Sequence, residues 1–398
     1  MSALDTSLYL SAREAAAELG VTPATLYAYV SRGKVRSVAR AGTRSRLYLA
    51  EDVRALLARG ATSEESRRAA LTFGGPVLDS AITLIADHAL YYRGRDALRL
   101  ATAQSLEAVA TLLWERTRDP FRSAAPEFPR PLQRLLDDPA FGALDRAALA
   151  LDYLAPRDPS AHNFTSDGSA ETGARILRTV SGAVLRSTPG CQPLHHQLAS
   201  AFGAAPQAAE WLRSALVLSA DHELNASTFA VRVAASTRAS LYRAVSAGLA
   251  TLVGPEHGGM IDRAEALLDE LLGASDARAA LGARLRRGDA LPGFGHPLYP
   301  RGDPRARLLL RRLTADGALP ANVAFKSLTR AAQLSAGLHP TLDLALAFLA
   351  RRLGLAAGSA VGLFAIGRSA GWIAHAMEQY QAATLIRPRA RYVGQHPA

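Results

Sequence analysis

The stretch PGFGHPLYPRGDPRA, residues 292–306, is the most informative part of the chain, because glycine, proline and charged residues interrupt a pattern that is otherwise helical. Glycine beside His296 lets the backbone come close to a ligand, so this histidine is a candidate site residue. Two similar segments contain His222 (DHELNAST) and His257 (GPEHGGM). One such segment is as consistent with a structural role as with a functional one. Three of them within 75 residues indicate a functional site.

Outside these segments, the chain after about residue 71 is rich in alanine, leucine and arginine and has few runs of β-branched residues. This composition predicts a mainly α-helical body without a long β-rich segment. The Pro- and Ser-rich stretch 156–173 predicts a connection between two helices. A chain of 398 residues is long enough for two or three domains.

One acidic residue and three arginines add to the candidate site. Asp343 ends the segment PTLD, at the start of an apolar helix. A carboxylate there is either a first-turn residue favoured by the helix dipole or a desolvated base. Arg305, Arg368 and Arg387 occur in non-repetitive settings. Because guanidinium groups pair with carboxylates through two parallel hydrogen bonds, these arginines suggest a di- or tricarboxylate ligand.

The composition argues against several classes of protein. The single cysteine, Cys191, can form neither an internal disulfide nor a cysteine-based metal cluster. The sequence has no HExxH, Walker or dinucleotide-binding motif, so we expect no metal and no resident cofactor. No apolar run reaches the roughly 18 residues that span a bilayer, and the N-terminus lacks the layout of a signal peptide. We therefore expect a cytoplasmic protein without a membrane segment.

The net charge of +11 is weak support for nucleic-acid binding by itself. All but two of the 46 basic residues are arginines, and an excess of arginine and alanine commonly follows genome base composition. The position of the basic residues is more informative than their number.

The first 60 residues form a separate predicted unit. Ser11 and Glu14 predict a capping box for a first helix, and Thr22-Pro23 predict the start of a second. The expected elements after the first helix are a helix to about Ser31, extended runs at 35–38 and 47–49, and a helix from Glu51. Two helices with a tight turn, then a hairpin and a helix, describe a winged helix-turn-helix. Residues 8–57 resemble the MerR/excisionase family over this whole span.

This resemblance implies DNA binding. No acidic residue lies between Glu18 and Glu51, whereas six basic residues do: Arg32, Lys34, Arg36, Arg40, Arg44 and Arg46. In such a fold the second helix enters the major groove and cations on the wing contact phosphates. The alternative is a small module for protein contacts whose arginines are only solvated. The polar residues 61–71 are interpreted as a linker.

Residues from about 76 to the C-terminus resemble the citrate synthase family, with the matching segments in family order. These segments are GPVLDSAITLIADHALYYRGRDALRLA, SLEAVATLLWERTRDP, DHELNASTFAVRVAAST, GPEHGG, PGFGH with DPRA, PTLD, and FAIGRSAGWIAHAMEQ with LIRPRARYVG. The resemblance implies that His222 contacts oxaloacetate and that His257 holds the thioester carbonyl of an acyl-CoA. It also implies that Asp343 removes a proton from the acyl α-carbon while His296 polarises the oxaloacetate ketone.

The resemblance further implies that Arg305, Arg368 and Arg387 bind carboxylates, with Arg387 supplied by the partner subunit of a homodimer. The implied body is an all-α fold of two domains. Its expected boundaries are 72–258 with 356–398 for the large domain and 259–355 for the small domain.

One position departs from the family pattern. Members usually carry Lys or Arg four residues after the PGFGH histidine, where this chain has Pro300 followed by Arg301. Arg301 is therefore the candidate for contacting the CoA phosphates. The expected reaction is condensation of acetyl-CoA with oxaloacetate and water to give citrate and CoA. The alternatives are a 2-methylcitrate synthase that uses propionyl-CoA, and a DNA-binding transcription regulator whose synthase-like body senses a metabolite.

Overall fold

The computed structural model describes residues 9–19, 21–39, 45–53, 56, 78–315, 319–390 and 392–395. The chain forms two compact units, residues 1–79 (the N-terminal unit) and residues 80–398 (the body), which are described separately. Among the described residues, no helix is long and apolar enough to cross a membrane. Within the same residues, no three His, Cys, Asp or Glu side chains gather as a metal site would require.

In the N-terminal unit, two helices share a core with a three-stranded antiparallel sheet of order β1-β3-β2. The elements are β1 (Tyr9–Ser11), α1 (Ala12–Leu19), α2 (Pro23–Ser31), β2 (Ser37–Ala39) and β3 (Arg46–Leu49), and a helical stretch follows from Ala50. The core contains Ala15 and Leu26 from the two helices and Tyr48 from the sheet. The predicted helix-turn-helix with a hairpin is thus confirmed. Strand β1 was not predicted, because three residues are too few to show a β pattern.

Both predicted helix starts are present in the N-terminal unit. Ser11 N–H donates to Glu14 Oε2 at 2.8 Å, and Glu14 N–H donates to Ser11 Oγ at 3.3 Å. Thr22 Oγ1 accepts from Thr25 N–H at 3.3 Å, and Pro23 occupies the first turn. These bonds satisfy amides that have no partner within the helix. The caps are local in sequence, and so the sequence was sufficient to predict them.

The body consists mainly of helices, with one small antiparallel sheet of order β4-β5-β6. The strands are β4 (Thr83–Ala86), β5 (Ala89–Tyr92) and β6 (Arg95–Asp96). The first helices are α4 (Ala97–Ala103), α5 (Leu106–Leu113), α6 (Arg130–Leu136), α7 (Ala143–Leu154), α8 (Ser166–Leu185), α9 (Leu194–Ala201), α10 (Pro206–Ser219), α11 (Ala226–Ser236) and α12 (Leu241–Leu252). The others are α13 (Gly259–Gly273), α14 (Ala277–Arg287), α15 (Pro304–Leu313), α16 (Pro320–Ala336), α17 (Leu342–Arg352) and α18 (Ser359–Ala382).

The predicted connection at 156–173 is correct only as far as Thr165, which caps α8 by accepting from Gly168 N–H at 3.1 Å. The small residues beyond Thr165 continue the helix because they face a packed interior. A Cβ on Gly173 would lie 2.8 Å from Ile373 Cγ2 and 3.2 Å from the Trp114 ring. Tertiary packing here overrides the local tendency of serine and glycine to form a loop.

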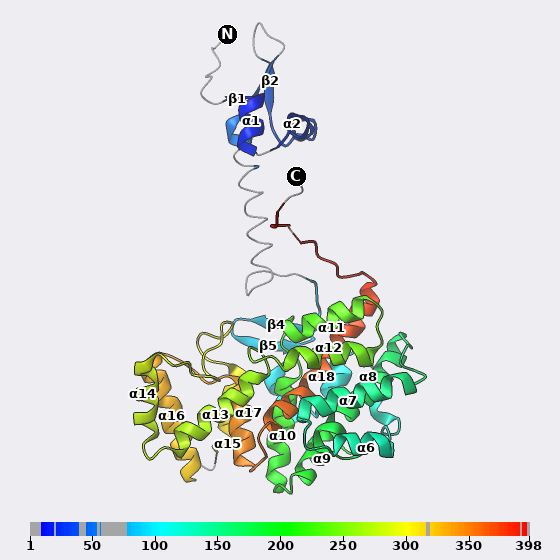
Figure 1. Ribbon diagram of the computed structural model, residues 1–398, viewed down its shortest axis with the longest axis vertical. Helices are drawn as coiled ribbons and strands as arrows, with labels where there is room; N and C mark the ends of the chain where they lie inside the picture. Colours follow the sequence, from blue (N-terminus) through cyan, green and yellow to red (C-terminus); the bar gives the residue numbers. More distant parts are fainter. Residues whose placement is uncertain are drawn as a thin grey trace. The chain divides into compact units, whose positions relative to one another are not determined.

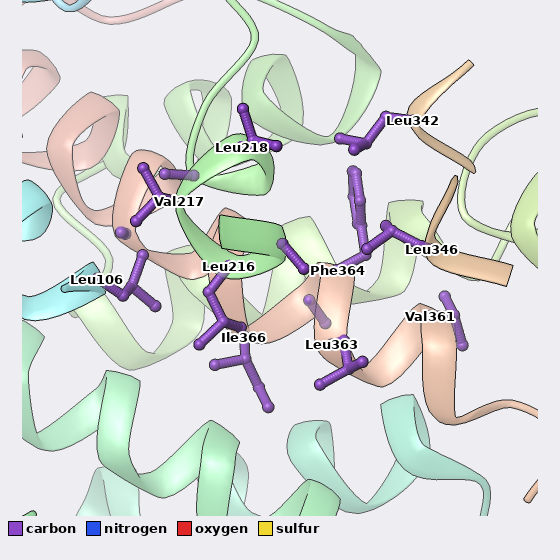
Figure 2. Packing of buried hydrophobic residues seen from close by; sticks show 14 of the residues in the cluster. Leu106, Leu216, Val217, Leu218, Leu342, Leu346, Val361, Leu363, Phe364 and Ile366 are labelled. Atoms are coloured by element: carbon purple, nitrogen blue, oxygen red, sulfur yellow. The ribbon is translucent and has the colours of Figure 1, made fainter. Parts of the chain in front are cut away.

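Helix α18 is the central element of the body (Figure 1) and contacts α7, α8, α10, α11, α12 and α17. Most of its residues are buried, as expected for a helix that is apolar on all sides. Figure 2 shows Leu363, Phe364 and Ile366 of α18 in the hydrophobic core with Leu216 of α10. This core fixes the position of α18, which carries Arg368, and of α10, which ends just before the segment with His222.

Helices α13 to α17 lie together at one side of the body (Figure 1), where α13 and α15 both contact α17. They fall within the region predicted as the small domain. The boundaries given above for the two domains stay a prediction.

Candidate active site

The segment DHELNAST connects α10 to α11 and carries His222. Asn225 of this segment caps the start of α11, and its Oδ1 accepts from Thr228 N–H at 3.0 Å. His222 is 8% exposed, and its Nε2 lies 3.0 Å from the hydroxyl of Tyr299. Burial, followed by the charges of Arg305 and Arg368, lowers the pKa of His222 well below its usual value. The imidazole is therefore neutral at pH 7.

The segment PGFGH is held against the start of α17. Gly293 and Gly295 have φ of 81° and 76°, in the left-handed region that favours glycine. Gly295 N–H donates to His339 O and Thr341 N–H donates to Gly293 O, both at 2.8 Å. These two bonds join the backbone before His296 to the backbone before Asp343. Residues 47 positions apart in the sequence are thus brought to one site.

His296 has a defined proton arrangement. Its Nδ1 accepts from Leu298 N–H at 3.1 Å, so the proton of the neutral ring is on Nε2. Burial, assisted by the charge of Arg305, lowers the pKa of His296 to about 4. The ring centroids of His222 and Tyr299 lie 5.3 and 5.0 Å from that of His296. His296 therefore offers a neutral N–H donor beside two other polar rings.

Asp303 organises the arginine of the DPRA segment. It caps α15, and its carboxylate binds Arg305 through Nε at 3.0 Å and Nη2 at 2.8 Å. The same carboxylate accepts from Leu342 N–H at 3.1 Å, which links α15 to α17. Burial disfavours the charge on Asp303, but Arg305 outweighs this and lowers the pKa of the carboxyl group. The Nη1 group of Arg305 takes no part in this pair and forms no hydrogen bond with another residue in the part of the chain that the structure describes, so it can bind a ligand.

Arg368 is 1% exposed on α18. Its Nε donates to Ser219 O at 2.9 Å, and its guanidinium lies over the Phe364 ring at 4.6 Å. Burial lowers the pKa of Arg368 to about 10, so it stays charged at pH 7. Its two Nη groups bond to no other described residue, which leaves a buried positive fork for an anionic ligand.

Asp343 lies in the first turn of α17, where Thr341 Oγ1 donates to its Oδ2 at 3.0 Å. Burial raises the pKa of Asp343, and the nearby Arg305 opposes this increase only in part. A desolvated carboxylate is a stronger base toward a weak carbon acid than a hydrated one. The structure thus places the predicted base within the electrostatic range of the predicted carboxylate-binding arginines.

His257 precedes α13, and its Nε2 lies 2.7 Å from Ser227 Oγ. Burial lowers the pKa of His257 to about 4. Ser227 Oγ also lies 2.8 Å from Asn225 Oδ1 and accepts from Trp372 Nε1–H at 3.2 Å. Asn225 and His257 therefore compete for the single hydroxyl proton of Ser227. When Ser227 donates to His257 Nε2, the ring proton is on Nδ1, which can then donate to a substrate carbonyl.

Two further predicted residues lie elsewhere. Arg301 Nε donates to His88 Nε2 at 3.0 Å, next to a cavity of about 280 Å³ lined by Gly295, His296, Tyr299, Pro300, Gly337, Leu338 and His339. Arg387 is exposed in the segment after α18, and among the described residues it forms no hydrogen bond or ion pair with the site residues. Its assignment to a partner subunit stays a prediction, as does the assignment of Arg301 to CoA.

The basic residues of the N-terminal unit differ in their surroundings. Arg36 forms a two-pronged pair with Asp52, with both bonds at 2.8 Å, and so its charge is largely balanced. Arg46 donates to Ser37 Oγ at 3.0 Å and thus braces the hairpin. Arg32 and Lys34 are exposed after α2. Arg40 and Arg44 lie outside the described residues.

Sequence reasoning missed four side chains that shape this site: Asp221, Ser227, Tyr299 and Asp303. Ser227 and Asp221 belong to the DHELNAST segment, and Asp303 belongs to DPRA, so their proximity to predicted residues was a usable signal. Tyr299 lies in the stretch 292–306, three residues after His296, but nothing in the sequence connected it with His222. Its contact with His222 spans 77 positions and exists only in the fold.

One buried and two half-buried imidazoles, a desolvated carboxylate and two buried arginines define a helical enzyme that can polarise carbonyl groups and hold carboxylates. Residues 72–389 match the family described as citrate synthase, C-terminal domain, and residues 9–61 match a helix-turn-helix domain. The chain belongs to the citrate synthase family.

Relatives in this family include proteins named citrate synthase and proteins named 2-methylcitrate synthase. Citrate synthase 2 of Bacillus subtilis (strain 168) is 30% identical over 349 residues, which cover 79% of this chain and 93% of that protein. The 2-methylcitrate synthase of Mycobacterium tuberculosis (strain ATCC 25618 / H37Rv) is 30% identical over 335 residues, covering 77% and 85%.

Solved structures share the fold. Citrate synthase from Pyrobaculum aerophilum superimposes with a TM-score of 0.68 at 22% identity, covering 82% of this chain and 92% of that one. Citrate synthase from Thermoplasma acidophilum, in a ternary complex with carboxymethyl coenzyme A and oxaloacetate, gives a TM-score of 0.67 at 24% identity, covering 81% and 95%.

Proposed function

We propose that this protein condenses an acyl-CoA thioester with oxaloacetate and releases CoA after hydrolysis. The observation that supports the proposal is the pair of backbone hydrogen bonds that joins the segment before His296 to the segment before Asp343. His296 is a neutral N–H donor and Asp343 is a desolvated base. Arg305 lies close enough to lower the pKa of both His296 and Asp343, and Arg368 lies close enough to lower that of His222. The two arginines suit the two carboxylates of oxaloacetate.

In the first step, Asp343 takes a proton from the α-carbon of the thioester while His257 donates a hydrogen bond to the carbonyl oxygen. The α-proton is weakly acidic, so the base and the oxygen donor must act together. His257 can donate from Nδ1 when Ser227 donates to its Nε2, an arrangement that the 2.7 Å contact allows.

In the second step, the enol carbon attacks the ketone carbon of oxaloacetate and forms the new carbon–carbon bond. His296 Nε2–H faces the charge that develops on the ketone oxygen and supplies its proton. Water then cleaves the thioester, which gives the tricarboxylate and free CoA. Only protons and an acyl group are transferred, so the proposal includes no redox group and no metal.

The direct test is release of free thiol from acetyl-CoA in the presence of oxaloacetate, followed with a thiol reagent. The matched control is Asp343→Asn, which keeps the size of the side chain and removes the base. Oxaloacetate-dependent thiol release by the wild type alone is expected. Equal rates for the two proteins would show that the thiol has another source.

The choice between acetyl-CoA and propionyl-CoA is part of the proposal, with acetyl-CoA as the expected substrate. Relatives named citrate synthase and 2-methylcitrate synthase match this chain at the same 30% identity. Specificity constants for both thioesters, measured at saturating oxaloacetate, decide between them. A kcat/KM at least tenfold higher for propionyl-CoA would reassign the protein as a 2-methylcitrate synthase.

We also propose that the N-terminal unit binds DNA. A specific observation favours this second function: α2 is free of charged side chains and presents the 54%-exposed Tyr27, while Arg32 and Lys34 are exposed at its end. This arrangement suits a recognition helix that is flanked by phosphate contacts.

Band shifts on the gene's upstream DNA at rising salt test the DNA proposal. Each lost phosphate contact lowers the slope of log K against log salt by about 0.9, so Lys34→Ala is expected to reduce that slope by about 1. Arg36→Ala is the comparison, because Arg36 is already paired with Asp52. Absent binding, or binding that does not respond to salt, would favour a protein-contact module. Adding oxaloacetate or CoA to the same assay tests metabolite sensing.

A further inference from the structure

The segment that carries His222 lies between two helices, yet its backbone is held firmly from outside. Gly371 N–H of α18 donates to Ala220 O at 3.0 Å. The single proton of the Tyr92 hydroxyl is shared between Asp221 O at 3.2 Å and Val217 O at 3.1 Å, and Asp221 N–H lies 3.3 Å from the same hydroxyl oxygen. These contacts come from β5 and α18, two elements that are distant in sequence from the segment.

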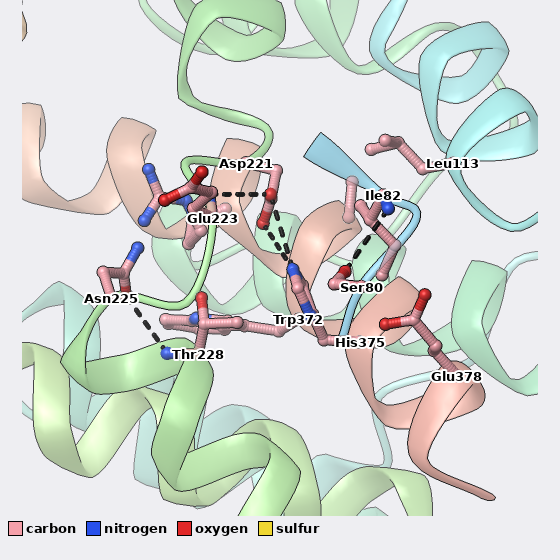
Figure 3. A network of polar contacts seen from close by, with 12 residues as sticks. Ser80, Ile82, Leu113, Asp221, Glu223, Asn225, Thr228, Trp372, His375 and Glu378 are labelled. Atoms are coloured by element: carbon pink, nitrogen blue, oxygen red, sulfur yellow. Dashed lines mark hydrogen bonds and ion pairs between the residues drawn. The ribbon is translucent and has the colours of Figure 1, made fainter. Parts of the chain in front are cut away.

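Asp221, next to His222, forms a fully buried pair with His375 of α18 (Figure 3). Both side chains are 0% exposed, and His375 Nε2 lies 3.4 Å from each carboxylate oxygen. Asp221 Oδ2 also accepts from Glu223 N–H at 3.1 Å. That bond closes a turn in which Glu223 has a φ of 56°, a left-handed conformation that costs a non-glycine residue energy. His222 is the residue inside this turn.

We propose that His375 and Asp221 form a positioning pair that holds His222 in place for oxaloacetate, an inference that rests on the proposed condensation reaction. The Asp221 carboxylate closes the turn around His222, and His375 fixes that carboxylate to α18. If the carboxylate rotates, the turn loses its bond and His222 moves away from Tyr299.

The place of His375 on α18 explains why this anchor suits the site. His375 follows Arg368 by seven residues, two helical turns, so both side chains lie on the same face of one helix. Arg368 is the buried carboxylate-binding candidate, and Asp221 helps to balance its charge. The pair therefore keeps His222 at a fixed offset from Arg368, and both groups would contact the same substrate.

The pair is poorly explained as a source of stability alone. Asp221 Oδ1 and His375 Nδ1 are buried and have no hydrogen-bond partner among the described residues. A buried polar pair with unsatisfied atoms commonly stabilises a fold no more than apolar residues of similar volume. Its effect on geometry, through His222, is therefore the property to test.

The test is steady-state kinetics by thiol release, with oxaloacetate and acetyl-CoA varied separately. Asp221→Asn and His375→Leu are each expected to raise KM for oxaloacetate at least tenfold while KM for acetyl-CoA changes less than twofold. His375→Gln is expected to restore the wild-type KM, because its amide nitrogen can donate from the position of Nε2. Ser369→Ala is the matched control, since Ser369 is fully buried on α18 but, among the described residues, bonds only to Ala365 O of its own helix.

An unchanged KM for oxaloacetate in Asp221→Asn would overturn the proposal, and this near-isosteric variant decides the matter if His375→Leu does not fold. Equal rises in both KM values, together with a lower unfolding midpoint, would also overturn it, because they mark a purely structural role. A wild type without turnover would refute the condensation reaction instead. In that case, calorimetry of oxaloacetate binding to the wild type and to Asp221→Asn would test whether the Asp221–His375 pair positions His222. Equal affinities, or no binding to the wild type, would reject this positioning role.

Discussion

Alanine at position 371 is expected to destabilise the body and weaken oxaloacetate binding together. An ideal Cβ at Gly371 would lie 2.3 Å from Ala220 O and 2.4 Å from Asp221 Oδ1. Carbon–oxygen contacts normally require about 3.3 Å, so the backbone of the His222 segment would have to move by roughly 1 Å. Overpacking of this kind costs about 1–3 kcal/mol, and backbone atoms cannot rotate away as a flexible side chain can.

The helix preference of alanine opposes this cost. Alanine is favoured over glycine inside a helix by up to about 1 kcal/mol, so the expected net loss for Gly371→Ala is roughly 1 kcal/mol. Gly273→Ala is the matched control, because Gly273 is also helical and has no neighbouring atom within 4 Å of its ideal Cβ. The control therefore measures the helix preference without the clash.

Urea unfolding followed by circular dichroism gives the stability of both variants, and thiol release gives KM for oxaloacetate. We expect Gly273→Ala to be at least as stable as the wild type with an unchanged KM. Gly371→Ala should unfold at lower urea and show a KM for oxaloacetate raised about tenfold, which corresponds to about 1.4 kcal/mol. Equal stability of the two variants, with equal KM values, would refute the close approach of α18 to the end of α10.

Four further predictions concern the proposed site. Asp343→Asn should lower kcat by about 10²–10⁴ with oxaloacetate affinity retained in calorimetry; loss of both would make Asp343 structural. Ser227→Ala should lower kcat about tenfold, the effect of one lost orienting hydrogen bond, without changing KM for oxaloacetate, and an unchanged kcat would count against the His257 arrangement. Burial raises the pKa of Asp343, and the carboxylate is its active form, so kcat/KM should fall as the pH is lowered, with a midpoint above the ordinary pKa of 3.8. Nitrogen NMR at pH 6 should find His257 and His296 neutral. Imidazolium signals at pH 6 would contradict the low pKa values of these two histidines. Mixing Arg387→Ala with Asp343→Asn subunits should restore about a quarter of wild-type activity if each site draws Arg387 from its partner, and no recovery would argue against a shared site.

Much of the candidate site could be predicted from the sequence, because its segments carry local irregularities. Glycine beside His296 and His257 is visible in the sequence itself and indicates that both histidines are candidate site residues. The fold gives them different surroundings: His296 shares ring contacts with His222 and Tyr299, whereas His257 contacts Ser227 and Phe364. The sequence could not show which of these residues contact one another, because most of the contacts join segments that are tens of residues apart.

Local physics explains what the sequence determined by itself. A capping box or an N-cap involves residues three positions apart, so Ser11 with Glu14 and Thr22 with Thr25 could be predicted from adjacent letters. The mainly helical character of the body and the helix-turn-helix of the N-terminal unit follow from the same short-range preferences.

Only the tertiary structure decided which polar groups form contacts with one another. Arg36 was expected to contact DNA, but it forms an ion pair with Asp52. Asp52 is 16 positions later in the chain and lies outside the acid-free stretch that contains Arg36. Asp221 meets His375 across 154 positions, and Thr341 meets Gly293 across 48. A buried charge needs a polar partner. The packing of the helices decides which residue becomes that partner, and the linear sequence does not contain this information.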